Sequence, residues 1–354
     1  MNKPWKAVTI YDIALKIGKS PSTVSRALND HPMIKDQTKN LVRKTAKELG
    51  FEPDNRTGQH IAHGVNAIGV IVPFLNKDGM ADMVTSILDT VAKAGYDVII
   101  SQSMDSAKRE AELLRNMFTR KIKGLLICLA AEKKEPFQFA KYQQFNIPVC
   151  SFFRTLDDSY GGKIYINNQT ASYKLTAHLI AEGCIKIGYV IGQSNTQAFS
   201  DRIIGYMAAL KDHKIAFSKD LIFHTTMNVS GGEIIARKIA ESRNSVDGLI
   251  FSDDSCAIGC MNTLKQYGKL IPEDISIACF NSTGAELLAH PPLTAIDYSH
   301  HQIGKLAALQ LINEIKSEQT QQRQPFSLEV GHQLVIRSSS QKKTSIELQS
   351  TMDK

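Results

Sequence analysis

Apolar residues recur at helical spacing in two short runs near the N-terminus. The first run falls at positions i, i+3, i+4 and i+7, occupied by Ile10, Ile13, Ala14 and Ile17. Thr9 can cap this helix and Gly18 can end it. Ser20 can cap a second helix that begins at Pro21, where a missing N–H costs nothing, and runs to about Asn29. Only a short turn separates the two predicted helices.

A third helix is expected between Asp36 and Gly50, with inward-facing residues at Leu41, Val42, Ala46 and Leu49. On the second helix Val24, Ala27 and Leu28 point to the core, while Pro21, Ser22 and Arg26 share the exposed face. Two helices joined by so short a turn form a helix-turn-helix, whose second helix enters the major groove of DNA. Arg26 can donate two hydrogen bonds to a guanine edge.

From Ala67 onward the pattern changes to continuous apolar runs, each followed by an amphipathic segment. A first set of expected strands covers residues 68–73, 96–101, 124–129 and 147–153. A second set covers residues 164–167, 187–192, 221–225, 248–254 and 275–280. Continuous apolar runs that alternate with helices indicate parallel strands buried on both faces. The sequence therefore predicts two similar α/β lobes, with a ligand in the cleft between them, beyond the carboxyl ends of the strands.

Composition and charge indicate a class of partner. The chain has 354 residues, 43% hydrophobic and 22% charged, which is enough for a large core and for two or three domains. Residues 1–64 hold 11 Lys and Arg against 6 Asp and Glu, so most of the formal charge of +7 lies there. Positive charge at that end suits phosphate contacts. No apolar run reaches membrane-spanning length and no secretory signal is evident, so we expect a cytoplasmic protein, associated with the nucleoid through DNA.

Other chemistry is faint. The six cysteines are scattered without metal-ligand spacing, which favours buried reduced thiols and neither a metal nor another cofactor. Glycine-rich phosphate loops and a nucleophile elbow are absent from the sequence. Asp253 and Asp254 are adjacent and should point apart, unlike a catalytic carboxylate pair, and His300 and His301 fit solvated or capping groups better than metal ligands. The chain is therefore not expected to be an enzyme.

Several segments carry a family resemblance. Thr9 opens T-I-x-D-I-A, Ser20 opens S-P-S-T-V-S-R-A-L-N, and ELGFEP follows at Glu48; similar segments continue to Arg337. The chain resembles the lactose-repressor (LacI/GalR) family of bacterial regulators. The resemblance implies a helix-turn-helix headpiece and a body like a periplasmic sugar-binding protein, acting as a dimer or tetramer on a pseudopalindromic operator. It also implies that Pro21, Ser22 and Arg26 contact bases, and that phosphates are held by Thr9, Tyr11, Ser20, Thr23, Ser25 and Asn29.

The segment between headpiece and body departs from the family pattern. Where the family has Ala and a Leu that wedges into the minor groove, this chain has Thr57 and His60. Gly58 would weaken a hinge helix by about 1 kcal/mol relative to Ala. Either Ile61 supplies the wedge through a one-residue shift, or DNA kinking is reduced.

The resemblance also locates an effector site. Arg202 falls at the family's R-x-x-G arginine, Asp253 and Asp254 fall where Asn-Asp is usual, and Asn281 stands at a position of Asp. Arg154, at a strand end, is a further candidate. These groups suit hydrogen bonds to sugar hydroxyls or to a carboxylate. The alternative is that Arg202 and Asp254 form a structural ion pair or a helix cap. At residues 77–80 this chain has KDGM where the family has N-P-F-F. The aromatic residues that often stack on a sugar are therefore missing.

We therefore expect an α/β fold with an all-α headpiece at 1–52, a hinge at 53–65, a two-lobed body at 66–337 and a polar tail without regular structure at 338–354. The first lobe should comprise about 66–163 and 297–323, and the second about 164–296 and 324–337. The expected function is that of a homodimeric repressor of double-stranded DNA operators, controlled by a small sugar-like effector. A binding protein of periplasmic type without DNA binding is the alternative, disfavoured by the headpiece. Whether the effector releases or promotes DNA binding is open.

Overall fold

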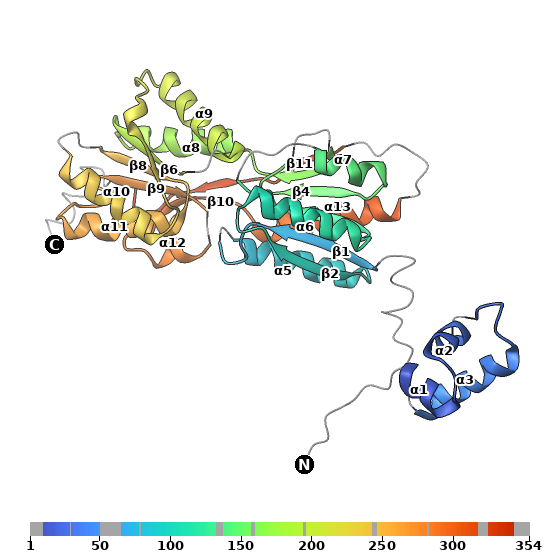
Figure 1. Cartoon of the computed structure of the whole chain (residues 1–354). Coiled ribbons are helices and arrows are strands. Elements are labelled where there is room, and N and C mark those ends of the chain that lie inside the picture. Colours follow the sequence, from blue (N-terminus) through green and yellow to red (C-terminus); the bar gives the residue numbers. More distant parts are fainter. Residues whose placement is uncertain are drawn as a thin grey trace, which may run out of the picture. The chain divides into compact units, whose positions relative to one another are not determined.

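The computed structural model describes residues 10–28, 30–49, 65–77, 79–131, 137–156, 160–193, 196–242, 246–281, 283–317 and 325–342. The chain divides into two compact units, Met1–Val65 and Asn66–Lys354, drawn in Figure 1. We call the described part of the first unit the headpiece and that of the second the body. Within the described residues, no helix combines the length and the apolar character that crossing a membrane requires.

The headpiece consists of three helices, α1 (Ile10–Ile17), α2 (Pro21–Leu28) and α3 (Asp36–Leu49), in agreement with the expected ones. Its core is small: Ile13, Ala14, Val24, Ala27, Val42 and Ala46. The prediction that Leu41 faces inward is wrong, because its side chain is 46% exposed whereas that of Thr45 is buried. Val42, Thr45, Ala46 and Leu49 follow the i, i+3, i+4, i+7 spacing of one helix face, and Leu41 lies beside that face.

The first lobe of the body is built on a parallel sheet in the order β11-β5-β4-β3-β1-β2. Its strands are β1 (Ala67–Val72), β2 (Asp97–Gln102), β3 (Gly124–Ile127), β4 (Val149–Phe152), β5 (Gly162–Tyr165) and β11 (Ser327–Glu329). Its helices are α5 (Met80–Lys93), α6 (Ala107–Thr119), α7 (Phe137–Gln144) and α13 (His300–Lys316). Helices α5 and α13 pack against each other. Burial of β1 along its whole length explains its continuous apolar sequence.

The second lobe repeats the arrangement in the order β12-β10-β9-β8-β6-β7, with only β12 antiparallel among these described strands. Its strands are β6 (Ile187–Gly192), β7 (Ile222–Thr225), β8 (Gly248–Phe251), β9 (Ser276–Phe280), β10 (Thr294–Asp297) and β12 (Gln333–Val335). Its helices are α8 (Asn168–Ala181), α9 (Gln197–Asp212), α10 (Val229–Glu241), α11 (Asp254–Gln266) and α12 (Ala285–Leu288), with a short 3-10 turn η2 (Lys219–Leu221). Helices α8 and α9 cover one face, and α10 and α11 the other (Figure 1).

The expected lobe boundaries need correction at two strands. The strand expected at 164–167 in the second lobe is β5, which pairs with β4 in the first lobe. Residues 324–337 were also expected in the second lobe, yet β11 pairs with β5 in the first. The described chain passes between the lobes after β5, between β10 and α13, and between β11 and β12. A short strand does not reveal from its own residues which sheet it joins, because pairing is made with residues far away in the chain.

The start of the expected polar tail is also ordered. Ser339 and Ser340 are fully buried, so the prediction of an unstructured tail from residue 338 is wrong for them. The Ser339 hydroxyl accepts a hydrogen bond from the backbone N–H of Thr294 at 2.8 Å and donates one to the carbonyl of Ile277 at 2.6 Å. Ser340 contacts His178 Nε2 at 2.7 Å. These hydroxyls satisfy polar groups of the second sheet and helix α8, which is why serine is stable there. Residues 343–354 lie outside the described part.

Candidate functional site

The N-terminus of α2 is fixed by its own side chains. Ser20 immediately precedes the helix, and its hydroxyl oxygen accepts a hydrogen bond from the backbone N–H of Thr23 at 3.2 Å. The same hydroxyl lies 2.9 Å from that of Ser22 and 2.8 Å from that of Thr23. This cap defines the first turn of α2, the part of a helix-turn-helix that approaches base edges.

Helix α2 has a buried and an exposed face. Val24 and Ala27 are fully buried against the other two helices. Ser22 and Arg26 are exposed, and Pro21 is partly exposed at the first helical position. The arginine can therefore reach a guanine edge without any change in the core. Thr23 and Ser25 are only partly accessible.

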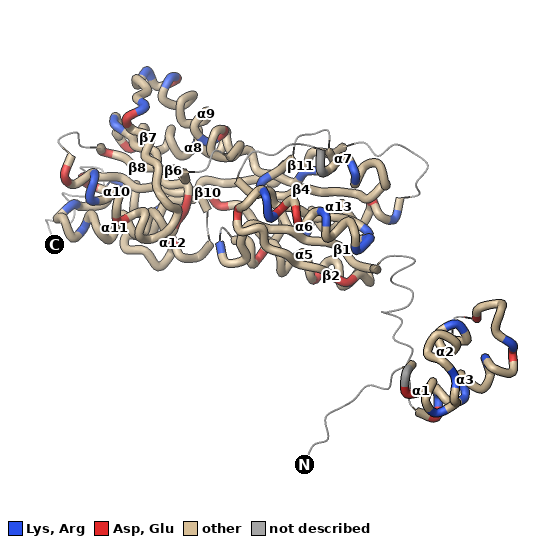
Figure 2. The backbone as a smooth tube through the Cα atoms, in the orientation of Figure 1, with Lys and Arg blue, Asp and Glu red and all other residues tan. Residues whose placement is uncertain are grey.

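Lys and Arg occur on all three headpiece helices (Figure 2). Several of them form ion pairs with acidic residues of the headpiece. Arg43 of α3 donates to the carboxylate of Asp30, which follows α2, at 2.5 Å, and Lys39 lies 3.7 Å from the same carboxylate. Exposed ion pairs of this kind contribute little to stability. Arg26 forms none of the ion pairs seen in the described residues, so its charge remains available to a ligand.

Several predicted DNA contacts cannot be placed. Thr9, Asn29, His60 and Ile61 lie outside the described residues, as does the side chain of Tyr11. The hinge at 53–65 is outside them except for Val65. The two alternatives for its contact with DNA therefore stay predictions.

The body contains a cavity of about 280 Å³ lined by residues of both lobes. Its walls lie beyond the carboxyl ends of the strands: Phe74 follows β1, Arg154 follows β4, Asp253 follows β8 and Asn281 follows β9. This is the location expected for a ligand of a parallel sheet. Arg154, Arg202, Asp253 and Asn281, all predicted effector residues, line the cavity, whereas Asp254 does not.

Arg202 is the most enclosed cation of the cavity. It lies on α9, is only 4% exposed, and donates from Nε to the side-chain oxygen of Asn168 at 2.8 Å. Its Nη1 donates to the carbonyl of Ser252 at 3.1 Å, and its guanidinium carbon lies 3.8 Å from the ring centroid of Phe280. These contacts orient the guanidinium group but supply no compensating negative charge, which favours an acceptor on a ligand.

Gly205, the glycine of the R-x-x-G motif, allows α9 to approach α8 closely. A Cβ atom at this position would lie 2.0 Å from the backbone oxygen of Gln169, far inside van der Waals contact. Gln169 is next to Asn168, the residue that orients Arg202. The glycine therefore serves the site indirectly, because it holds the helix of Arg202 against the helix of its partner.

The two adjacent aspartates have different roles. Asp253 precedes α11, and its carboxylate accepts a hydrogen bond from the backbone N–H of Cys256 at 2.9 Å, which makes it the helix cap. Asp254 turns away from the cavity and accepts from the backbone of Ser255 and the hydroxyl of Thr283. Neither forms the structural ion pair with Arg202 that was the alternative, while the capping alternative applies to Asp253.

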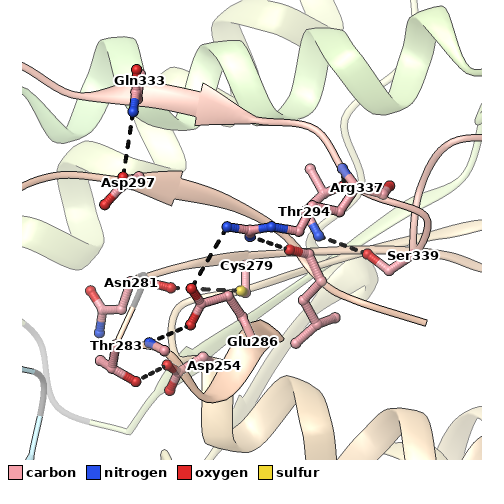
Figure 3. A network of polar contacts seen from close by, with 12 residues as sticks. Asp254, Cys279, Asn281, Thr283, Glu286, Thr294, Asp297, Gln333, Arg337 and Ser339 are labelled. Atoms are coloured by element: carbon pink, nitrogen blue, oxygen red, sulfur yellow. Dashed lines mark hydrogen bonds and ion pairs between the residues drawn. The ribbon is translucent and has the colours of Figure 1, made fainter. Parts of the chain in front are cut away.

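Asn281 connects the cavity to a segment that passes between the lobes. It is 2% exposed and has a left-handed backbone with φ of 68°, a conformation that asparagine tolerates better than most residues. Figure 3 shows Asn281 at the end of its strand near Thr283 and Asp254. Its side-chain oxygen accepts a hydrogen bond from the hydroxyl of Tyr298, which lies between β10 and α13.

Sequence reasoning missed several groups in the first lobe. Asp105 binds Arg154 Nη1 at 2.7 Å and also accepts from the backbone N–H of Ala131 at 2.9 Å. Lys77 lines the cavity with its Nζ atom 4.8 Å from the ring centroid of Phe74. Phe74 was a usable signal, because it is an aromatic residue close after the first strand and lines the cavity, where KDGM has no aromatic side chain. Asp105 offered no comparable signal.

Comparisons with known proteins agree with this geometry. A model of bacterial regulatory proteins of the lacI family matches residues 9–54, and a model of a periplasmic binding protein-like domain matches residues 176–340. The ribose operon repressor of Halalkalibacterium halodurans is 22% identical over 331 residues, 93% of this chain and 96% of that protein. The HTH-type transcriptional repressor CytR of Escherichia coli K12 is 26% identical over 313 residues, 88% of this chain and 91% of that protein.

Among solved structures, the lac repressor dimer bound to operator and the anti-inducer ONPF superposes with a TM-score of 0.72 at 20% identity, over 95% of this chain and 100% of that one. At this identity the superposition concerns the fold. It confirms the predicted architecture of a helix-turn-helix followed by two parallel-sheet lobes of periplasmic-binding type. The match of the headpiece model, the matching body model and the full-length relatives place the chain in one family. The chain belongs to the LacI family of bacterial DNA-binding transcriptional regulators, which are not enzymes.

Proposed function

We propose that this protein is a cytoplasmic repressor that binds a pseudopalindromic operator as a homodimer and changes its operator affinity when a small polar effector fills the body cavity. The effector is proposed to be a carbohydrate or a carbohydrate derivative. The observation that carries the proposal is the exposed face of α2, where Ser22 and Arg26 stand opposite a fully buried Val24.

On DNA, α2 would lie in the major groove with Pro21, Ser22 and Arg26 toward base edges. Phosphate oxygens would be held by the hydroxyls and amides nearby, proposed as Thr9, Tyr11, Ser20, Thr23, Ser25 and Asn29, with His60 or Ile61 toward the minor groove. A single helix of eight residues buries too little surface for strong discrimination. Two headpieces related by two-fold symmetry would double the contacts, and the related lac repressor structure is described as a dimer on its operator.

The effector would bind Arg202, Asp253, Asn281 and Arg154, with Asp254 acting only through Thr283. Because the cavity has walls on both lobes, a ligand that contacts both stabilises one relative placement of the lobes over others. Because the effector would bind one lobe placement more tightly than others, its binding can alter the spacing of two headpieces in a dimer. A related repressor is named for a ribose operon, which supports a sugar-like ligand class.

Selection of bound sequences from a random double-stranded DNA library tests the proposal. We expect enrichment of a two-fold symmetric motif by the full chain, and sedimentation of the unbound protein as a dimer at micromolar concentration. Enrichment of no motif would contradict sequence-specific binding. A monomer that still protects a specific site would contradict the dimeric arrangement.

A further inference from the structure

The charges around the body cavity are unevenly compensated. The cavity is lined by three cationic side chains, Lys77, Arg154 and Arg202, and by two carboxylates, Asp105 and Asp253. Asp105 already binds Arg154 and a backbone N–H of its own lobe. Asp253 already caps α11. Both carboxylates are thus engaged within their own lobes.

Two of the cations have no such partner among the described residues. Among the residues that the structure describes, no carboxylate lies within ion-pair distance of Arg202 or Lys77. Arg202 is 4% exposed, and a buried cation without a counter-charge is costly. Its neighbours Asn168, Ser252 and Phe280 are neutral, so they satisfy N–H groups and the ring face without balancing the charge. A ligand hydroxyl would likewise leave the charge unbalanced, whereas an anion would balance it.

Lys77 adds an independent indication from the opposite lobe. It precedes α5, whose N-cap is Gly79, and its carbonyl accepts the backbone N–H of Met80 at 2.9 Å. The partial positive charge of a helix N-terminus favours anions and disfavours a lysine. Its Nζ atom lies over the ring of Phe74 at the cavity wall. From this wall of the cavity the lysine can reach a negative group on a ligand, which the nearby helix N-terminus would also favour.

From these observations we infer that the effector is a small polyol that carries an anionic group, a carboxylate or a phosphate, held between Arg202 of the second lobe and Lys77 of the first. The inference rests on the proposed function of the cavity as the effector site. A cavity of about 280 Å³ lies at the lower end of the range for small-molecule sites, which fits one sugar ring or a short open chain. Asp253 and Asn281 accept hydrogen bonds from hydroxyls, and Phe153 and Phe199 cover the carbon skeleton.

The anion also provides a physical reason for ligand-dependent closure. Lys77 on one lobe and Arg202 on the other carry like charges that oppose the approach of the lobes, whereas Arg154 is already paired with Asp105. An anionic group between them changes repulsion into two attractions. A neutral polyol forms hydrogen bonds with both lobes but leaves the repulsion in place, so it stabilises the closed arrangement less.

The test is calorimetric titration of the full-length protein with matched probes. Glucose is compared with glucuronate and with glucose 6-phosphate, and glucitol with gluconate, at constant ionic strength. We expect at least one anionic probe to bind about tenfold or more tightly than its neutral partner. The glucuronate and glucose 6-phosphate arms distinguish a carboxylate from a phosphate. If no anionic probe binds at millimolar concentration, or if the neutral partners bind as tightly, the inference is wrong.

Two variants locate the effect. Lys77→Gln removes an exposed charge, so we expect it to fold normally and to lose most of the preference for the anionic probe. Arg202→Lys keeps the charge but loses the planar fork, and should weaken anion binding about tenfold or more. Lys238→Gln is the matched control, because Lys238 lies 5.2 Å over the ring of Phe223 but outside the cavity. An anion preference that survives in both Lys77→Gln and Arg202→Lys would overturn the assignment.

Operator binding, measured in parallel, separates this inference from the proposed function. A neutral sugar that binds and alters operator affinity would support the proposed function and contradict the anionic effector. Absence of any specific operator would contradict the proposed function, while calorimetric binding of the anionic probe to the cavity would still support the ligand class.

Discussion

The headpiece and the body place their candidate binding groups in opposite surroundings. In the headpiece, Ser22 and Arg26 are exposed while a small apolar core holds the helices together. In the body, Arg202 and Asn281 are almost completely buried, and each is hydrogen bonded to protein groups. The candidate DNA contacts can therefore be removed without loss of fold, whereas removal of the candidate effector contacts also changes stability.

The largest expected effect is on the headpiece core. Ile13 is fully buried among the three helices, so Ile13→Ala should destabilise the headpiece by about 2–5 kcal/mol. A unit of this size has little stability to lose, and it should unfold. We expect operator binding to disappear while the melting of the body and its ligand binding persist, as measured by calorimetry. Leu15→Ala on the same helix, at a side chain 86% exposed, is the control. Unchanged operator binding by Ile13→Ala would contradict the role of this core, and a lower melting temperature of the body would contradict the separation of the two units.

The second effect concerns the coupling of binding and stability in the body. Arg202→Ala should weaken effector binding by about 2 kcal/mol or more, because charge-assisted hydrogen bonds are lost. It should also change the melting temperature of the body, because an unbalanced buried charge is removed while Asn168 and the carbonyl of Ser252 lose their donor. Operator binding without effector should stay nearly unchanged. Arg237→Ala, at an exposed arginine paired only with Glu233 among the described residues, is the control. A lower melting temperature with unchanged effector affinity would show a purely structural arginine.

The third effect concerns an exposed headpiece residue, whose removal should change DNA affinity but not stability. Arg26→Ala should reduce specific operator affinity by about 1–3 kcal/mol and leave the melting of the headpiece unchanged. Competition with random DNA in an electrophoretic or fluorescence assay separates base reading from phosphate contact. An equal loss on operator and random DNA would assign Arg26 to the phosphates.

The smallest effect is a pH dependence of the body alone. Burial lowers the pKa of His178, and the charge of Glu182 only partly opposes this. The unfolded chain therefore binds the proton more readily, so stability contributed by neutral His178 is present above the unfolded pKa of about 6.5 and is lost as pH falls below it. His178→Gln should lose less stability than the natural protein between about pH 7 and 5, in thermal melts. Burial also lowers the pKa of His332. This residue is present in both proteins, so it affects both pH profiles in the same direction. Equal pH profiles would exclude His178 as the source.

The predictability of the fold follows the range of the interactions involved. The headpiece helices were predictable because Ser20, Pro21 and the apolar spacing from Ile10 to Ile17 act within one or two helical turns. The strands were predictable as apolar runs, but the partners of β5 and β11 were not, since pairing joins residues far apart in the chain. The burial of Ser339 and Ser340 was missed for the same reason, because their partners Ile277, Thr294 and His178 are distant in sequence.

The candidate site divides in the same way. Residue types and positions at strand ends, together with the family resemblance, sufficed to nominate Arg154, Arg202, Asp253 and Asn281 as cavity residues. Only the tertiary structure decided that Asp254 turns toward Thr283, that Asp105 engages Arg154, and that Arg202 and Lys77 are left without carboxylate partners in the described residues. Whether a charge is compensated depends on its distance from groups that folding brings together from both lobes. The order of residues along the chain does not specify these distances.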